Sequence, residues 1–140
     1  MKFQVLLLWA LRIVAALIMI QSLFFKFSAS EESVYIFSTL GIEPWGRIGT
    51  GVMELIASIL ILYPKTTSFG ALLGAGLMAG AIFSHLATKL GIEVKGDGGL
   101  LFAYACIVLL SCVVLLWFHQ HQIKEIISKI LGKQNLKSVD

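Results

Sequence analysis

Residues 66–88 read TTSFGALLGAGLMAGAIFSHLAT and contain no Asp, Glu, Lys or Arg. Residues 98–118, GGLLFAYACIVLLSCVVLLWF, are equally free of charged side chains. A helix of about 20 apolar residues crosses the hydrocarbon core of a bilayer, and both stretches reach that length. They therefore predict two membrane-spanning helices, and a chain built around them is an integral membrane protein.

Two further apolar stretches are candidate spans, although each contains one ionisable side chain. Residues 3–25 include Arg12, and residues 48–63 include Glu54. Charged groups inside a membrane are costly unless another group neutralises them. We count both stretches as spans, because the cation of one is able to neutralise the anion of the other. The expected fold is an all-α bundle of four transmembrane helices that forms a single domain over residues 1–121.

The composition of the whole chain agrees with this fold class. Its 140 residues are 58% hydrophobic, and the mean hydropathy is +0.90. An ordinary soluble domain is nearer half apolar. The formal net charge is only +3, and most of the charges lie between the apolar stretches, so the sequence offers no basis for nucleic-acid binding. The lipid bilayer is the expected partner.

Basic residues beside the spans predict the orientation. With both termini inside, the inner segments carry six Lys or Arg residues and the outer loops carry four. The positive-inside rule then places the N- and C-termini in the cytoplasm, in what we expect to be a bacterial inner membrane. A cleaved secretory signal is the disfavoured alternative: Lys2 and an apolar run precede Ser28-Ala29-Ser30, but the run is too long and Arg12 interrupts it.

Two segments outside the spans also have helical patterns. The run from Ser30 to Gly41 has apolar residues at three-residue steps and predicts a short outer helix that caps the bundle. Residues 122–140 interleave apolar residues with lysines, which predicts a cytoplasmic amphipathic helix on the membrane surface, followed by a tail. A plain helical extension of the fourth span is an open alternative.

Helical spacing brings the ionisable side chains toward one another. Arg12 and Lys26 share a face of the first span. Arg12 and Glu54 each lie nine residues from the inner ends of their spans, which predicts an intramembrane ion pair. Lys26, Glu54, His85 and Tyr104 are predicted to line a polar pocket below the outer surface, with Arg12 as its floor. A structural network that only fixes helix register is the alternative.

The third span adds a packing signal. Gly70 and Gly74 form one small-residue pair, and Gly76 and Gly80 form a second pair on the roughly opposite side. Such pairs allow close helix approach. The side with Gly70 and Gly74 is then available for the bundle interior. The side with Gly76 and Gly80 predicts a homodimer contact.

Several short motifs follow one another along residues 7–116. They are Leu11-Arg12 with Lys26 fourteen residues later, Leu40-Gly41-Ile42-Glu43-Pro44, Glu54-Leu55-Ile56-Ala57, and Met78 to His85. This ordered set resembles the DoxX family of small four-helix membrane proteins. The resemblance implies a four-helix fold. Some members of the family are linked to quinone-dependent sulfur oxidation or to membrane oxidoreductase complexes, so the resemblance also implies a role beside redox partner proteins. Here Gln21-Ser22-Leu23-Phe24-Phe25 replaces the family's glycine-rich approach to the lysine, which leaves the ligand preference open.

The predicted pocket suits a quinone headgroup. His85, Tyr104 and Lys26 are candidate hydrogen-bond donors to its carbonyl oxygens, and Glu54 is a candidate proton carrier. The sequence contains no haem or iron–sulfur motif, so redox equivalents must come from elsewhere. We therefore expect a membrane subunit that supports redox chemistry and binds a quinone-like or other lipophilic ligand, with catalytic residues unassigned. A non-catalytic scaffold or assembly factor with structural charges is the alternative.

No metal site is predicted. His119 and His121 are two residues apart, and that step points their side chains to different sides of a helix.

Overall fold

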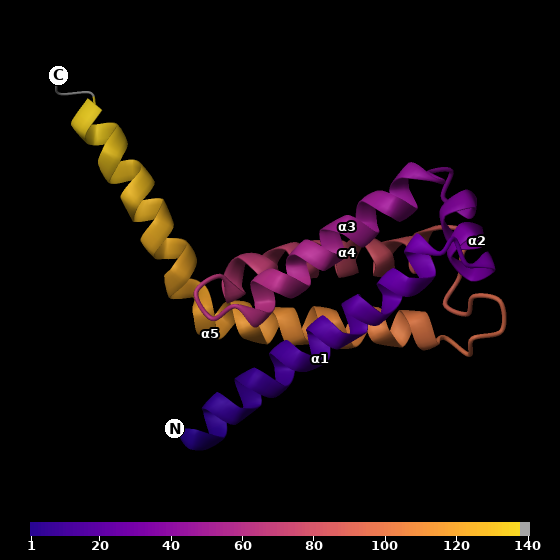
Figure 1. Ribbon diagram of the computed structural model, residues 1–140, viewed down its shortest axis with the longest axis horizontal. Coiled ribbons are helices and arrows are strands. Elements are labelled where there is room, and N and C mark those ends of the chain that lie inside the picture. The colour runs from indigo at the N-terminus through magenta and orange to yellow at the C-terminus, as the bar shows by residue number, and fades with distance from the viewer. Residues whose placement is uncertain (138–140) are drawn as a thin grey trace.

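The computed structural model describes the backbone of residues 1–137 and the side chains of residues 1–132. Within that range it is helical and has no strand. The helices are α1 (Lys2–Phe27), α2 (Glu31–Thr39), α3 (Trp45–Leu62), α4 (Thr67–Ala87) and α5 (Leu100–Lys137). α1, α3, α4 and α5 are long and apolar enough to cross a membrane. The predicted four-span helical fold is confirmed (Figure 1).

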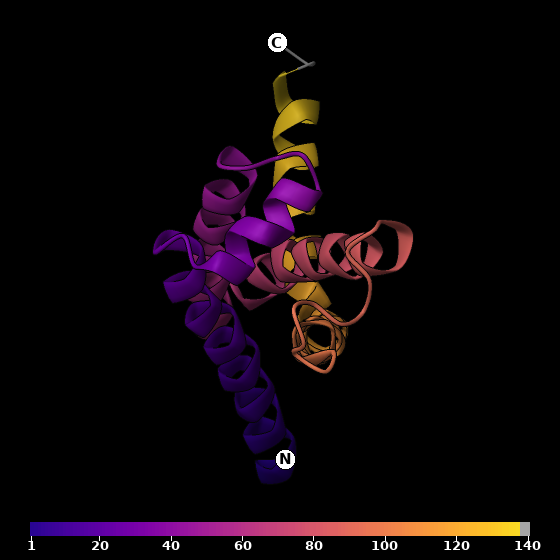
Figure 2. The ribbon, with the colours of Figure 1, turned by 90° about the vertical axis from the view of Figure 1, so that its right-hand side faces the viewer.

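The four long helices form a ring in which each helix packs against two others. α1 contacts α3, α3 contacts α4, α4 contacts α5, and α5 contacts α1. We call the end that carries α2 and residues 88–99 the capped end, and the end with the α3–α4 turn at residues 63–66 the hairpin end. α2 lies at the capped end, against α1 and α3 (Figure 2). The N-terminal part of α1 extends past the hairpin end (Figure 1).

Small residues set the distance between α3 and α4. A Cβ atom added at Gly70 would lie 2.5 Å from the backbone nitrogen of Ile61 and 2.8 Å from the carbonyl oxygen of Ala57. At Gly76 and Gly80, an added Cβ would meet nothing within 4 Å. The first glycine pair therefore serves the bundle interior, while the second faces open space. The homodimer contact through the second pair stays a prediction.

α5 continues from the fourth span to Lys137 without a break. Beyond the hairpin end it leaves the bundle at an angle (Figure 1). Residues 122–137 are therefore helical and directly continuous with the fourth span. Ile126, Ile127, Ile130 and Leu131 are exposed there, so the extension keeps the apolar side chains that a membrane-surface helix needs. The predicted tail at residues 138–140 lies outside the described residues.

Asp97 organises the turn that precedes α5. Its Oδ1 accepts hydrogen bonds from the backbone N–H groups of Val94 at 2.9 Å and Gly99 at 2.8 Å, and its Oδ2 accepts one from Leu101 at 3.0 Å. Burial raises the pKa of this carboxyl, but the three hydrogen bonds and nearby His85 outweigh that effect. The pKa of Asp97 therefore lies below its ordinary value.

Replacing Asp97 by asparagine is expected to lower the free energy of unfolding by about 1 kcal/mol at neutral pH, because it removes the negative charge near the N-terminus of α5 and weakens the charge-assisted hydrogen bonds. A lowered folded-state pKa gives stability that is complete above the unfolded-state pKa of about 4 and is lost as the pH falls through the folded-state value. The wild type should therefore lose more stability on acidification than Asp97→Asn. Thermal unfolding in detergent from about pH 3 to pH 7 measures both curves; parallel curves would contradict the assignment.

Candidate functional site

A cavity of about 550 Å³ lies at the capped end, with walls from all five helices. Small-molecule sites have volumes of roughly 300–1,000 Å³. The four side chains predicted to share a pocket, Lys26, Glu54, His85 and Tyr104, all line this cavity. Most of the remaining lining is apolar, and it includes Ile18, Met19, Phe37, Leu77, Met78 and Leu101. The cavity therefore has an apolar body with a few polar groups in its wall.

An ion pair in the cavity wall joins α1 to α3. Lys26 Nζ lies 2.9 Å from Glu54 Oε2, and the two side chains are 16% and 8% exposed. Lys26 Nζ also donates a hydrogen bond to Ser22 Oγ at 3.0 Å. Ser22 Oγ lies 2.7 Å from both Glu54 Oε2 and the carbonyl oxygen of Met19, either of which is able to accept its single proton. Lys26, Ser22 and Glu54 thus form one buried charged cluster.

The predicted ion pair between Arg12 and Glu54 is wrong. Glu54 pairs with Lys26, whereas Arg12 Nη2 lies 2.7 Å from His119 Nε2 on α5. Glu54 contacts Ser22, which lies ten residues or about 15 Å along α1 from Arg12. Arg12 also does not line the cavity, so it is not the pocket floor.

The reason lies in the unequal helix lengths. α1 has 26 residues and α3 has 18. The extra length of α1 projects beyond the hairpin end, as Figure 1 shows. Arg12 and Glu54 are each nine residues from the inner ends of their predicted spans, which puts them at one depth only if both helices end at the same level. Side-chain packing sets the relative height of neighbouring helices, and here it moves Arg12 toward the hairpin end.

His85 is held by the loop that follows its helix. Its Nδ1 lies 2.6 Å from the carbonyl oxygen of Gly91, and because a carbonyl only accepts, Nδ1 carries a proton. The ring packs edge-on against Phe102, with 5.7 Å between centroids. In a neutral ring, Nε2 is then a hydrogen-bond acceptor. This changes the predicted role, since neutral His85 offers a ligand an acceptor and only protonated His85 offers a second donor.

Tyr104 contributes the other polar group from α5. Among the described residues, its hydroxyl has no hydrogen-bond partner, and the side chain is half-buried. The phenol is therefore available to donate a hydrogen bond to a ligand. Phe25 and Leu100 also line the cavity and are 45% and 49% exposed on the outer surface of the bundle. These two side chains are thus part of both the cavity lining and the exposed surface.

Two residues that position this site, Ser22 and Arg47, were not predicted from the sequence. Ser22 lies four residues before Lys26, a spacing that brings side chains together on a helix. Arg47, which is 7% exposed, donates from Nε to Glu43 at 2.7 Å and from Nη1 to the carbonyl oxygen of Lys26. Arg47 thereby satisfies a carbonyl at the end of α1 and holds the backbone of Lys26. The four-residue spacing of Glu43 and Arg47 was the available signal.

Comparison with known proteins gives one match. A family model described as the DoxX-like family matches residues 10–115. That range includes all the cavity residues named above. No curated protein and no solved structure matches the chain.

Proposed function

The chain belongs to the DoxX-like family, and from this premise we propose that it is a membrane subunit of a redox system that binds a quinone-like ligand in the cavity at the capped end. The observation that carries the proposal is the cavity itself. It is largely apolar and about 550 Å³ in volume, and it gathers Lys26, Glu54, His85 and Tyr104 at its wall. A lipophilic molecule with a polar head matches that lining.

A quinone presents two carbonyl oxygens in its oxidised form and two hydroxyl groups in its reduced form. The Tyr104 hydroxyl and an ammonium proton of Lys26 are donors for the carbonyl oxygens. Nε2 of neutral His85 is an acceptor for a hydroxyl of the reduced form. The apolar lining then accommodates the hydrocarbon tail.

The charged groups also account for the protons. Oxidation of a quinol to a quinone releases two protons and two electrons. His85 Nε2 and the Glu54 carboxylate are bases at the cavity wall that accept protons. Because the sequence has no haem or iron–sulfur motif, the electrons pass to a redox partner protein. The chain is therefore proposed as the quinone-binding part of a larger complex.

Binding of a soluble quinone with a short alkyl tail tests this proposal in detergent. Replacing Tyr104 by phenylalanine removes one hydrogen bond and is expected to weaken binding about fivefold. Tyr63→Phe is the matched control, because Tyr63 is an exposed residue at the hairpin end of α3. Absence of saturable binding in the wild type, or equal weakening by both substitutions, would count against the proposal.

A scaffold or assembly factor is the second candidate function. It is favoured by the way the charges join backbone ends, since Arg47 bonds both Glu43 and the end of α1. In that case the Lys26–Glu54 pair only fixes the height of α1 against α3. The two functions predict different results when both members of the pair, Lys26 and Glu54, are replaced in one variant.

We also propose the cytoplasmic location of both termini, in a bacterial inner membrane, and a homodimer through Gly76 and Gly80. Lys65 and the lysines of the α5 extension support the orientation, because all of them lie at the hairpin end. Open space around the two glycines supports the dimer. Gly80 also lines the cavity, so a second copy bound there would lie next to the ligand.

A further inference from the structure

Arg12 is a buried cation that has no acidic partner among the described side chains. The residue is 6% exposed, and its Nε is buried without any hydrogen-bond partner. Its one hydrogen bond within the described residues joins Nη2 to His119 Nε2 at 2.7 Å. His119 Nδ1 donates to the carbonyl oxygen of Leu115 at 2.9 Å, so Nε2 serves as the acceptor of a neutral ring. His119 therefore orients the guanidinium without neutralising it.

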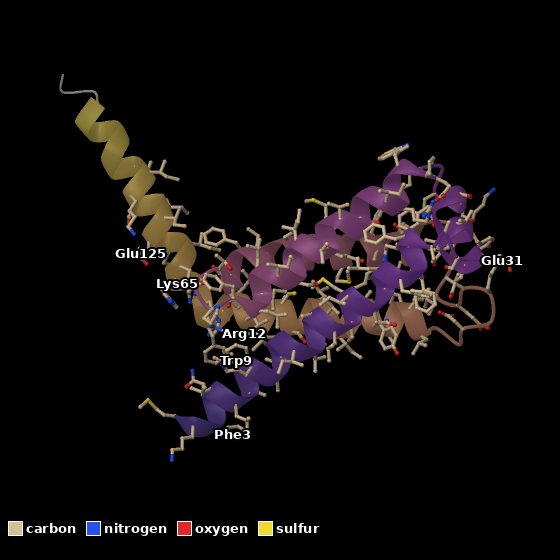
Figure 3. All side chains as sticks on the ribbon, viewed as in Figure 1. Phe3, Trp9, Arg12, Glu31, Lys65 and Glu125 are labelled. Atoms are coloured by element: carbon tan, nitrogen blue, oxygen red, sulfur yellow. The ribbon has the colours of Figure 1, made fainter. Side chains whose placement is uncertain are left out.

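The surrounding charges do not neutralise Arg12 either. Figure 3 shows Arg12 and Lys65 at the hairpin end and Glu31 at the opposite end. Among the described side chains, Glu125 is the one acid on the α5 extension, and it pairs with Lys129 at 3.2 Å. The other described acids belong to the cavity or the capped end: Glu31, Glu32, Glu43, Glu54, Glu93 and Asp97. A buried guanidinium without a counter-ion is unfavourable, so an external anion would stabilise it.

The depth of Arg12 identifies the source of that anion. The Trp9 ring centroid lies 4.7 Å from the Arg12 guanidinium carbon. Trp117 and Tyr63 are also exposed at the hairpin end of α5 and α3. Exposed Trp and Tyr side chains mark the level of lipid headgroups in membrane proteins. The aromatic side chains therefore point to the phosphate groups of the bilayer as the source of that anion.

We propose that Arg12, oriented by His119 and covered by Trp9, binds the phosphate of an anionic phospholipid at the hairpin end of the bundle. With Nη2 bonded to His119 and Nε buried, Nη1 is the donor that remains for a charge-assisted hydrogen bond to a phosphate oxygen. Lys65, which lies at the same end, attracts an anionic headgroup toward the site. This site is separate from the cavity, which Arg12 does not line.

Lipid titration of the purified chain in neutral detergent tests this site, with bound lipid counted by native mass spectrometry. The probes are phosphatidylglycerol, phosphatidylcholine and inorganic phosphate. The wild type should prefer phosphatidylglycerol to phosphatidylcholine by about fivefold. Both lipids carry a phosphate, but only phosphatidylglycerol has a net negative charge, which is worth about 1 kcal/mol to one nearby cation. Arg12→Met should lose that preference, and Arg12→Lys should keep part of it. Lys124→Met is the control, since it removes an exposed cation of α5, and it should keep the preference.

Three results would overturn the proposal. The first is equal affinity of the wild type for the two lipids. The second is an equal loss in Lys124→Met and Arg12→Met, which would indicate diffuse attraction rather than a site. The third is a site that inorganic phosphate fills completely, so that added phosphatidylglycerol does not bind there. That result would assign the site to free phosphate. If Arg12→Met does not fold, the wild-type comparison and Arg12→Lys decide.

Discussion

Replacing Glu54 by glutamine is expected to lower the free energy of unfolding by about 3 kcal/mol, because breaking a buried ion pair leaves an uncompensated charge. The charge left behind is the ammonium of Lys26, whose side chain is 16% exposed. Ser22 remains as its hydrogen-bond partner at 3.0 Å, but a hydroxyl supplies no negative charge. Unfolding of the purified chain in mixed detergent measures the loss.

The double variant Lys26→Met/Glu54→Gln is the control for that experiment. It removes the stranded ammonium, so it should recover most of the stability that Glu54→Gln loses. Losses that simply add in the double variant would show that the two side chains are not coupled. The recovered double variant also gives a folded chain without the ion pair, which is the material needed to separate a ligand site from a scaffold.

Replacing Gly70 by alanine is expected to cost about 3 kcal/mol, at the upper end of what an overpacked core position costs. The added methyl group would lie 2.5 Å from the backbone nitrogen of Ile61 and 2.8 Å from the carbonyl carbon of Leu60. Backbone atoms of a helix do not move aside as flexible side chains do, so α3 and α4 must separate. The melting temperature in detergent should fall accordingly.

Gly76→Ala is the matched control on the same helix. An added Cβ there meets nothing within 4 Å, and alanine favours a helix over glycine by up to about 1 kcal/mol. The control should therefore be neutral or stabilising in the monomer. A Gly70→Ala chain as stable as the wild type would contradict the close α3–α4 packing.

The sequence predicted the features that depend on local pattern. Hydropathy over about 20 residues located the four spans, because the bilayer imposes that length on each helix separately. Helical periodicity placed Glu54 and His85 on inward faces, and the structure buries both. Ser30 was predicted to begin the short outer helix, and it is the N-cap of α2.

The relative heights of the helices could not be predicted from local sequence pattern. Arg12 and Lys26 share one face of α1, so periodicity alone did not decide which of them reaches Glu54. That choice depends on how α1 slides along α3, which is set by packing between residues distant in the chain. One such contact lies between Gly51 of α3 and Phe27 of α1, where a Cβ atom added at Gly51 would lie 2.9 Å from the Phe27 ring. The tautomer of His85 likewise depends on Gly91 in a loop whose path the sequence did not predict.

The most direct test of a quinone site is the amount of quinone that purifies with the chain from its own membrane in mild detergent. Mass spectrometry should find close to one quinone per wild-type chain and little in the folded Lys26→Met/Glu54→Gln variant. Wild-type chain that carries no quinone, or equal amounts in both proteins, would contradict the account and favour a scaffold whose charges only hold its helices.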